Sequence, residues 1–318
     1  MLTLENEIHK RVLAVLNGRP QLGRKVEFRV SKSRDELAAA IPMAQIFFGW
    51  RLSDNHFWQA QNLRWIHLAS AGIDGALPEA AFKSNIQITC SKGIHKTPMA
   101  ETAMAMMLAL TRNLHVARDL QKEKRWAHEI IAHDLSILER KTLGIIGAGN
   151  IGRAIAARAK VFGLKTIGVN SDGHRVPGFA EVKSYSRLAW LLKESDIVVV
   201  CSPLTESTRN LLGPRQFALM KKGVILVNIA RGRIIDQAAL IDALSSRKVS
   251  AAALDVFESE PLAADSPLWE MPNVIITPHI GGIMPDLYEK LINLFCDNLE
   301  KYLSGKRLSG IVNKNKGY

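Results

Sequence analysis

The sequence predicts an α/β protein with two domains, the larger of which is built on a doubly wound parallel sheet. The chain has 318 residues, more than a single hydrophobic core usually serves. Apolar runs of strand length alternate with helical stretches along most of it. One stretch, residues 142–163, passes from an apolar run through a glycine-rich turn directly into a helix. That succession is typical of the first strand, turn and helix of such a sheet.

The glycine-rich turn has the spacing of a phosphate-binding turn. Gly147, Gly149 and Gly152 form the pattern G-x-G-x-x-G directly after the apolar run Leu143–Ile146. The first glycine permits a tight turn, the second lets the backbone approach phosphate oxygens, and the third allows the helix to pack closely on the strand. Free amide groups at the helix N-terminus then attract an anion. Because Gly163 closes the helix and a further apolar run follows, this context favours a dinucleotide-binding Rossmann fold over an ordinary turn.

Composition disfavours several other classes of protein. The formal net charge is +12, but the basic residues form no long block and are not interleaved with aromatic residues, so we predict no nucleic-acid partner. A basic surface also favours small anionic substrates. Cys90, Cys201 and Cys296 are scattered without metal-ligand spacing, so we predict no bound metal and a reducing, cytoplasmic location. We also predict no membrane span and no signal peptide, since no apolar stretch has the required length and flanks.

The first part of the chain, residues 1–97, has the pattern of a small parallel α/β domain. Helical stretches separate its strand-like runs, and Ser33 and Glu36 form a capping box at the start of one helix. The segment from Ser70 to Gly72 follows an apolar strand, at the end where open α/β sheets bind ligands. These residues leave two interpretations open, a ligand-binding loop and an ordinary turn. The strand-like runs are Val12–Leu16, Val26–Val30, Ile46–Phe48, Trp65–Leu68 and Ile86–Cys90.

A long helix rich in alanine and methionine is predicted to connect the two domains. Thr97 can cap it, with Pro98 at its first position, and the helical pattern continues to Gln121. Apolar residues on more than one face indicate that this helix packs against another element or another subunit.

The end of the second strand after the glycine-rich turn bears on the choice of cofactor. An acidic residue there normally binds the ribose hydroxyls of NAD and repels the 2′-phosphate of NADP. This chain has Asn170 instead, and a neutral residue removes that repulsion. Ser171, His174 and Arg175 can contact a phosphate, which favours NADP. Asp172 can instead reach the ribose, which would favour NAD.

Further strand-like runs complete a doubly wound sheet of six strands. The six runs are Leu143–Ile146, Lys165–Val169, Ile197–Cys201, Val224–Asn228, Ala251–Asp255 and Val274–Thr277. Asp236 caps one of the helices between them. Residues 285–303 are helical in pattern and have no further strand to feed, so we expect them to cross back to the first domain. The first domain is then discontinuous, with residues 1–97 and 284–318, and the dinucleotide-binding domain comprises residues 98–283.

Three polar residues follow strands of the predicted sheet, at the end where ligands bind. Arg231 has a planar guanidinium that can hold a carboxylate. His279 titrates near neutrality and can give or take a proton. Glu260 beside it would favour the charged imidazole and leave the outer ring nitrogen facing a substrate. Each residue alone is more often structural, but together they supply what the reduction of a 2-keto acid by a nicotinamide requires.

Several motifs, in this order and at these intervals, resemble the D-isomer-specific 2-hydroxyacid dehydrogenase family, which includes glyoxylate and hydroxypyruvate reductases. They are GIIGAGNIG, SPLTESTRNLLG, NIARG, ALDVFESEPL and TPHIGG. The similarity extends more weakly to LRWIHLASAGID and PMAETAMAMMLALTR. It implies a Rossmann nucleotide domain, a smaller flavodoxin-like α/β substrate domain, an active site in the cleft between them, and a homodimer joined through the long helix.

The resemblance also implies roles for individual residues. Arg231 would orient the substrate, His279 would be the catalytic acid or base, and Glu260 would pair with His279. The substrate carboxylate would also be held by the loop of Ser70, Ala71 and Gly72. The residues implied in cofactor binding are Gly147, Gly149, Asn150, Ile151, Gly152, Asn170, Ser171, Arg175, Ser202, Pro203 and Asp255, the last near the nicotinamide ring.

The predicted reaction is NAD(P)-dependent reduction of a small 2-keto acid, with glyoxylate and hydroxypyruvate foremost and NADP favoured over NAD. Two alternatives stay open. One is oxidation of 3-phosphoglycerate or another 2-hydroxy acid, because the poorly matched first domain lines the specificity pocket. The other is a non-catalytic nucleotide-sensing protein like the family's transcriptional corepressors, which the intact set of Arg231, Glu260 and His279 disfavours.

Overall fold

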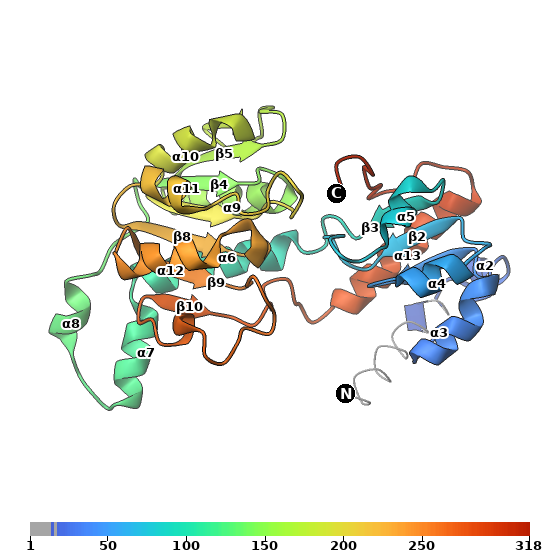
Figure 1. Cartoon of the computed structure of the whole chain (residues 1–318), viewed down its shortest axis with the longest axis horizontal. Coiled ribbons are helices and arrows are strands. Elements are labelled where there is room, and N and C mark those ends of the chain that lie inside the picture. The colour runs from blue at the N-terminus through green and yellow to red at the C-terminus, as the bar shows by residue number, and fades with distance from the viewer. Residues whose placement is uncertain (1–13, 16–17) are drawn as a thin grey trace. The chain divides into compact units, whose positions relative to one another are not determined.

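The structure, a computed structural model, describes residues 14–15 and 18–318 of the chain. It divides into two compact units (Figure 1). Unit 1 comprises the chain up to Ile94 together with Met284–Tyr318, and unit 2 comprises His95–Ile283. The first unit is therefore formed by both ends of the chain, and the second by its middle.

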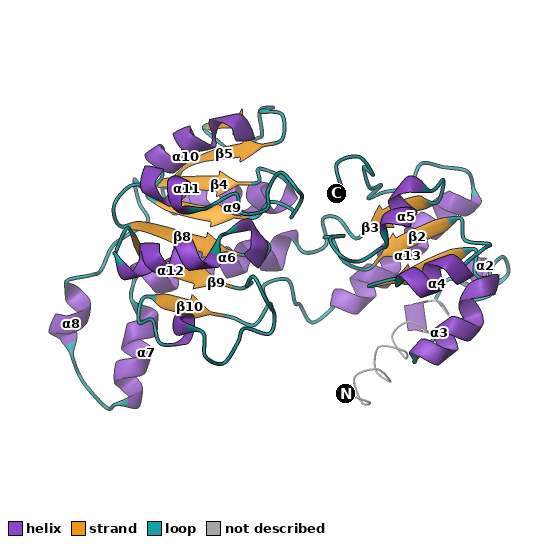
Figure 2. Cartoon of the chain, viewed as in Figure 1, coloured by secondary structure: helices purple, strands orange, loops and turns teal. Residues whose placement is uncertain are grey.

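Unit 2 is built on one sheet of parallel strands in the order β10-β9-β8-β7-β4-β5-β6 (Figure 2). From β4 the chain moves outward to β6, crosses back to β7 and then moves outward to β10, which is the doubly wound topology that the sequence predicts. Because neighbouring strands are parallel, their carboxyl ends share one edge of the sheet. The strands are β4 Thr142–Ile146, β5 Lys165–Asn170, β6 Glu181–Ser184, β7 Ile197–Val200, β8 Val224–Asn228, β9 Val249–Leu254 and β10 Val274–Ile276.

The sheet has seven strands, so the predicted number of six is wrong. The strand that the sequence analysis missed is β6, Glu181–Ser184, which lies at the edge beside β5. Val182 is the one apolar residue in it. A partly exposed edge strand does not need the apolar run that marks a strand buried on both faces.

Helices cover both faces of this sheet (Figure 1). Side chains alternate along β7, where Val199 packs with α6 and α9 while Val198 and Val200 pack with α10, α11 and α12. As predicted, Asp236 caps α12 by accepting a hydrogen bond from the amide of Ala239 (3.0 Å). The helices are α6 Lys96–Thr111, α7 Leu114–Lys122, α8 His128–Ala132, α9 Asn150–Val161, η2 Tyr185–Arg187, α10 Leu188–Glu194, α11 Pro214–Leu219, η3 Gly232–Ile234, α12 Gln237–Ser245 and η4 Pro267–Trp269.

The methionine-rich helix α6 differs from its prediction at both ends. It begins at Lys96, so Thr97 lies in its first turn rather than at the cap. Pro98 is tolerated there because amide groups of the first turn have no partner within the helix. The helix stops at Thr111, and Asn113, with a φ of 49°, separates it from α7. The buried methionines of α6 are Met104, Met106 and Met107, which pack in the core of unit 2.

Unit 1 contains a parallel sheet in the order β1-β2-β3. Along β2, Ile66 and Leu68 face one apolar core, whereas Trp65 and His67 contact Phe295 of α13 on the other face. Both faces of the central strand are therefore covered. The elements are α2 Pro20–Gly23, α3 Arg34–Ala40, η1 Ile41–Met43, β1 Ile46–Gly49, α4 Asp54–Gln59, β2 Trp65–Leu68, α5 Glu79–Lys83, β3 Gln87–Cys90 and α13 Leu287–Leu303.

Two of the strand-like runs expected in unit 1 need comment. Val12–Leu16 lies outside the described residues, apart from two helical positions. The strand predicted at Val26–Val30 is wrong, because this segment pairs with no strand that the structure describes. Val26 and Phe28 pack against the core beneath α13, while the charged Glu27 and Arg29 are exposed. The alternation therefore marks a half-buried extended segment, not a member of the sheet.

Candidate active site

Three neighbouring strands of unit 2 lead into the polar residues that the sequence singled out. Arg231 follows β8, Glu260 lies in the loop after β9, and His279 follows β10. These strands are adjacent in the sheet and run parallel, so the three segments leave from the same edge. The glycine-rich turn after β4 leaves from this edge as well, where open α/β sheets bind ligands.

His279 and Glu260 are in direct contact. Nδ1 of His279 lies 2.7 Å from Oε2 of Glu260, and the other carboxylate oxygen accepts a hydrogen bond from the amide of Phe257 (3.0 Å). The backbone of its own loop therefore orients the carboxylate. Because Nδ1 is engaged, Nε2 is the ring nitrogen left to face a ligand. The two side chains are 48% and 36% exposed, so the imidazole is accessible.

The loop that carries His279 is anchored on the buried carboxylate of Asp255. This carboxylate accepts hydrogen bonds from the hydroxyl of Thr277 (2.5 Å) and from the amides of Ile280 (3.0 Å) and Gly281 (2.9 Å). The amide of His279 donates to the backbone oxygen of Asp255 (2.9 Å). These contacts hold His279 at a φ of 55°, which residues other than glycine rarely adopt. The sequence analysis assigned Asp255 to the cofactor and missed this anchoring role, for which Thr277 in TPHIGG was the available signal.

The segment that carries Arg231 is held by its neighbours in the chain. The side chain of Asn228 donates to the carbonyl oxygen of Arg231 (3.2 Å), and the guanidinium donates to that of Ala230 (2.8 Å). A Cβ at Gly232 would lie 1.8 Å from the carbonyl carbon of Phe257. Glycine therefore lets the Arg231 segment pack against the start of the loop that carries Glu260. The sequence analysis singled out Arg231 but did not give Gly232 a role.

The turn after β4 has the geometry of a phosphate-binding turn. Gly147 has a φ of 108°, and a Cβ there would lie 2.6 Å from the amide nitrogen of Ser202. A Cβ at Gly152 would lie 2.4 Å from the carbonyl oxygen of Gly147. At Gly149 an added Cβ would meet no atom within 4 Å, so the space before α9, which begins at Asn150, is open. These residues fit the pyrophosphate of a dinucleotide, held at a helix N-terminus.

The segment after β7 lies against this turn. Ser202 is buried, and its hydroxyl has no hydrogen-bond partner in the described part of the chain. A buried hydroxyl without a partner fits a site that receives a polar ligand. Pro203 is exposed. The thiol of Cys201 donates to the carbonyl oxygen of Gly147 (3.1 Å), and burial raises its pKa to about 12, so it stays protonated.

The loop after β5 is ordered by its own side chains. Asn170 is buried. Its side-chain oxygen accepts a hydrogen bond from the backbone amide of Gly173 (2.6 Å), and its side-chain nitrogen donates to the carbonyl oxygen of His174 (3.2 Å). Nδ1 of His174 lies 2.5 Å from Oδ1 of Asp172. This hydrogen bond from His174 lowers the pKa of Asp172. Ser171, His174 and Arg175 are exposed.

In unit 1 the loop after β2 is tied to the loop after β3. The hydroxyl of Ser70 donates to the carbonyl oxygen of Gly72 (2.6 Å), and the amide of Ser91 donates to that of Ser70 (3.0 Å). Ala71 lies between them, half-buried. Ser91 is also within hydrogen-bond reach of the buried His67 (3.3 Å), which the sequence analysis did not single out.

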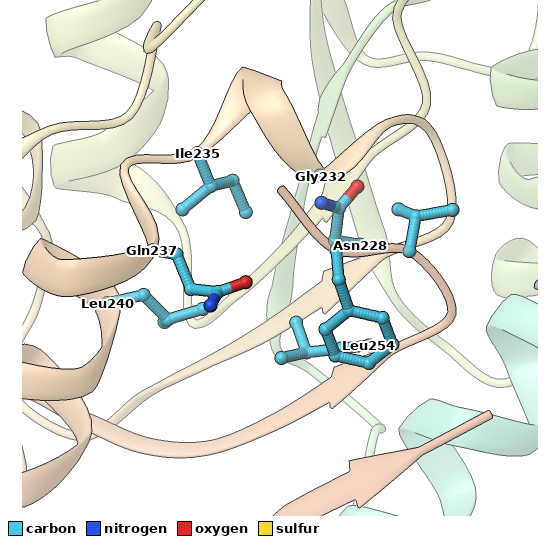
Figure 3. A pocket seen from close by; sticks show the side chains of 8 residues that line it. Asn228, Gly232, Ile235, Gln237, Leu240 and Leu254 are labelled. Carbon is cyan, nitrogen blue, oxygen red and sulfur yellow. The ribbon is translucent and has the colours of Figure 1, made fainter. Parts of the chain in front are cut away.

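A small cavity lies beside the Arg231 segment (Figure 3). Its volume of about 10 Å³ has room for about one water molecule. It is a gap in the packing and not a substrate site. Apolar side chains predominate among the residues that line it, which are Asn228, Gly232, Ile235, Gln237, Leu240, Leu254, Val256 and Phe257.

Within the part of the chain that the structure describes, no group of three or more His, Cys, Asp or Glu residues is placed to hold a metal ion. In residues 14–15 and 18–318, no helix combines the length and apolar character that crossing a membrane requires.

The fold and the site define a dinucleotide-dependent oxidoreductase, with a glycine turn that fits pyrophosphate and a histidine–carboxylate pair on the ligand edge of the same sheet. Residues 104–281 match the family model for the NAD binding domain of D-isomer specific 2-hydroxyacid dehydrogenases. The chain belongs to this family of NAD(P)-dependent enzymes, which confirms the family and the fold class inferred from the sequence motifs.

Relatives with known names agree with this family. The chain is 37% identical over 270 residues to a glyoxylate reductase of Thermococcus gammatolerans, covering 83% of this chain and 80% of that protein. It is 33% identical over 318 residues to a D-3-phosphoglycerate dehydrogenase of Methanocaldococcus jannaschii, covering 98% of this chain but 59% of that longer protein. Among solved structures, the NADPH-dependent glyoxylate/hydroxypyruvate reductase of Sinorhizobium meliloti, in complex with NADP and sulfate, is similar at a TM-score of 0.75. That match has 26% identity and covers 86% of each chain.

Proposed function

We propose that this protein reduces a small 2-keto acid, glyoxylate or hydroxypyruvate, to the corresponding 2-hydroxy acid with NADPH or NADH. The observation that carries the proposal is the 2.7 Å contact between His279 and Glu260, at the sheet edge from which Arg231 and the glycine-rich turn also leave. The names of the Thermococcus and Sinorhizobium relatives support this choice of substrate.

Each side chain of this edge has a distinct task in the proposed reaction. Arg231 binds the carboxylate of the keto acid, together with the loop of Ser70 to Gly72. His279 gives the proton on Nε2 to the oxygen that was the keto group. Glu260 contacts Nδ1 and fixes the orientation of the imidazole, so that Nε2 faces the substrate. The nicotinamide supplies the hydride when the cofactor is bound, with its pyrophosphate on the turn of Gly147 to Gly152.

A second candidate substrate is 3-phosphoglycerate or another 2-hydroxy acid. The match to the Methanocaldococcus dehydrogenase, which runs over nearly the whole of this chain, favours it. A panel of keto acids and hydroxy acids with both nucleotides, followed at 340 nm, separates the candidates. We expect glyoxylate or hydroxypyruvate to give the highest kcat/KM. Turnover of 3-phosphoglycerate alone would contradict our choice of substrate, and nucleotide binding without turnover of any acid would favour the sensing protein.

For the cofactor we propose a preference for NADPH over NADH. The absence of an acidic side chain at Asn170 and the exposed Arg175 nearby support this preference. Replacing Arg175 with alanine should weaken NADPH more than NADH in a titration of each reduced nucleotide. Equal losses for both nucleotides would show that Arg175 does not contact the 2′-phosphate.

We further propose a homodimer in the cytoplasm. Free thiols at Cys90, Cys201 and Cys296 support a reducing compartment. The dimer proposal is supported by large apolar side chains exposed along α7, α8 and the segments beside them, a pattern typical of interaction surfaces. These side chains are Leu114, Trp126, Ile130, Leu135 and Ile137. Sedimentation of the wild-type chain and of Trp126→Ser should show a dimer that the substitution weakens, and a monomer for both would exclude this surface.

A further inference from the structure

The loop after β5 contains an acidic side chain that is already paired. Oδ1 of Asp172 is 2.5 Å from Nδ1 of His174, and the same oxygen accepts a hydrogen bond from the His174 amide (3.3 Å). The two side chains are 61% and 63% exposed. The pair therefore lies on the surface, in the loop that follows the second strand of the dinucleotide-binding sheet.

The loop backbone holds these two side chains in place. Asn170 bridges the amide of Gly173 and the carbonyl oxygen of His174, which closes the loop behind the pair. Gly173 has a φ of 78°, and a Cβ there would lie 2.9 Å from the amide nitrogen of Ser184 in β6. The loop therefore packs tightly against the edge strand, and its conformation does not depend on the contact between Asp172 and His174 alone.

The other carboxylate near this loop is paired with a lysine, so Asp172 is the carboxylate that we expect to act on a ligand. On β6, Glu181 is paired with Lys183 (3.0 Å), which also lies over the ring of Trp190. Arg175 follows His174 directly and is exposed. The loop thus offers one paired carboxylate, one imidazole and one guanidinium to a ligand at the end of β5.

We propose that the pairing of Asp172 with His174 decides which adenosine ribose the loop accepts. The inference rests on the nucleotide site of the proposed function and names the residues that set its selectivity. When His174 engages the carboxylate, the repulsion between Asp172 and a 2′-phosphate is weakened, and Arg175 can attract that phosphate. Without His174, the exposed carboxylate repels the phosphate and is free to accept hydrogen bonds from unphosphorylated ribose hydroxyls, as acidic residues at this place in the fold do.

A nucleotide titration tests the proposal without any keto acid. NADPH and NADH are titrated by nicotinamide fluorescence into the full chain and into His174→Ala, Asp172→Asn and the double variant. His174→Ala should weaken NADPH about two- to fivefold relative to NADH, a size typical of exposed charge interactions. Asp172→Asn should leave NADPH binding as tight or tighter, and the double variant should recover the NADPH affinity that His174→Ala loses.

The control is His128→Ala, which removes an exposed histidine that pairs with Glu129 (3.4 Å) elsewhere in unit 2. It should change neither affinity. Equal loss of both nucleotides in His174→Ala, or a double variant no better than His174→Ala, would overturn the inference. Selective loss of NADH in Asp172→Asn would also overturn it, because Asp172 would then already bind the ribose. A wild-type chain that binds neither nucleotide would instead overturn the nucleotide site of the proposed function.

Discussion

Two histidines, one in each unit, have their Nδ1 atoms engaged by an oxygen at 2.7 Å. In unit 2, His279 is exposed and contacts a carboxylate, Glu260. In unit 1, His67 is fully buried and contacts a hydroxyl, that of Thr89. The exposed His279 is suited to proton transfer, whereas the buried His67 is suited to packing, although both contacts have the same length. The difference lies in the burial of the ring and in the charge of its partner.

Hydroxyl groups contact both ring nitrogens of His67. The hydroxyl of Thr89 accepts a hydrogen bond from Nε1 of Trp65 (2.9 Å), and it lies 2.7 Å from Nδ1 of His67 and 3.5 Å from the carbonyl oxygen of Ile66. Nε2 of His67 lies 3.3 Å from the hydroxyl of Ser91, which donates to the carbonyl oxygen of Leu68 (3.1 Å). Both ring nitrogens therefore contact uncharged hydroxyls rather than a carboxylate, so burial disfavours the charged ring.

The largest expected contrast concerns stability at acid pH. Burial lowers the pKa of His67 to about 4, whereas a histidine in an unfolded chain titrates near about 6.5. As the pH falls below the pKa of about 6.5 that this histidine has in the unfolded chain, the unfolded chain binds a proton and the folded chain does not. The stability that neutral His67 supplies is therefore complete above that value and is lost toward pH 4, by about 3 kcal/mol.

Urea unfolding followed by circular dichroism between pH 7 and pH 4 measures this loss. His67→Gln should reduce the pH dependence of the free energy of unfolding, and His56→Gln, at a half-buried histidine of the same unit, should not. If the free energy of unfolding changed with pH by the same amount in wild type and in His67→Gln, other groups would be the cause of the acid sensitivity.

A matched pair of substitutions at the Nδ1 partners should give the next largest contrast. Glu260→Gln keeps the size of the side chain but removes the carboxylate that contacts Nδ1 of His279, so we expect kcat to fall about tenfold or more with the urea midpoint unchanged. Thr89→Val keeps the shape but leaves Nε1 of Trp65 and Nδ1 of His67 without their partner, so we expect a loss of about 1–3 kcal/mol in stability. Steady-state rates should therefore fall mainly in Glu260→Gln, and urea midpoints should fall mainly in Thr89→Val. A rate loss in Thr89→Val as large as in Glu260→Gln would break the comparison.

The smallest effect is expected at Ser91. Ser91→Ala removes the hydroxyl that contacts Nε2 of His67 but keeps the backbone amide that holds Ser70. We expect a stability loss of about 1 kcal/mol and little change in KM for the keto acid. A rise in KM of about tenfold or more would mean that the hydroxyl, and not the backbone alone, positions the Ser70 loop.

The sequence predicted unit 2 better than unit 1, for a physical reason. Strands buried on both faces need apolar runs, and Ile197 to Val200 or Val224 to Asn228 show them clearly. The edge strand around Val182 needs no such run and was missed. Val26–Val30 alternates like a strand but has no strand beside it, because alternation reports burial on one face and not hydrogen-bond pairing.

The polar residues of the candidate site could be predicted from the sequence, but the contacts that hold them in place could not. Arg231, Glu260 and His279 stand at strand ends in recognisable motifs, so residue type and place were enough to select them. The anchoring by Asp255 and the close approach at Gly232 depend on which loops meet in space, and sequence spacing does not give that. His67 lies within an apolar run, where nothing in the pattern distinguishes a buried histidine from a catalytic one.

His279 is the group that gives the proton in the proposed reaction, and a paired measurement tests this role. Turnover of glyoxylate or hydroxypyruvate at saturating NADPH and the urea midpoint at pH 7 are measured for His279→Gln and His67→Gln. We predict that His279→Gln loses at least about a hundredfold in kcat with an unchanged midpoint, and that His67→Gln keeps most of its turnover but unfolds at lower urea. Turnover retained in His279→Gln would contradict the account, whatever happens to His67→Gln.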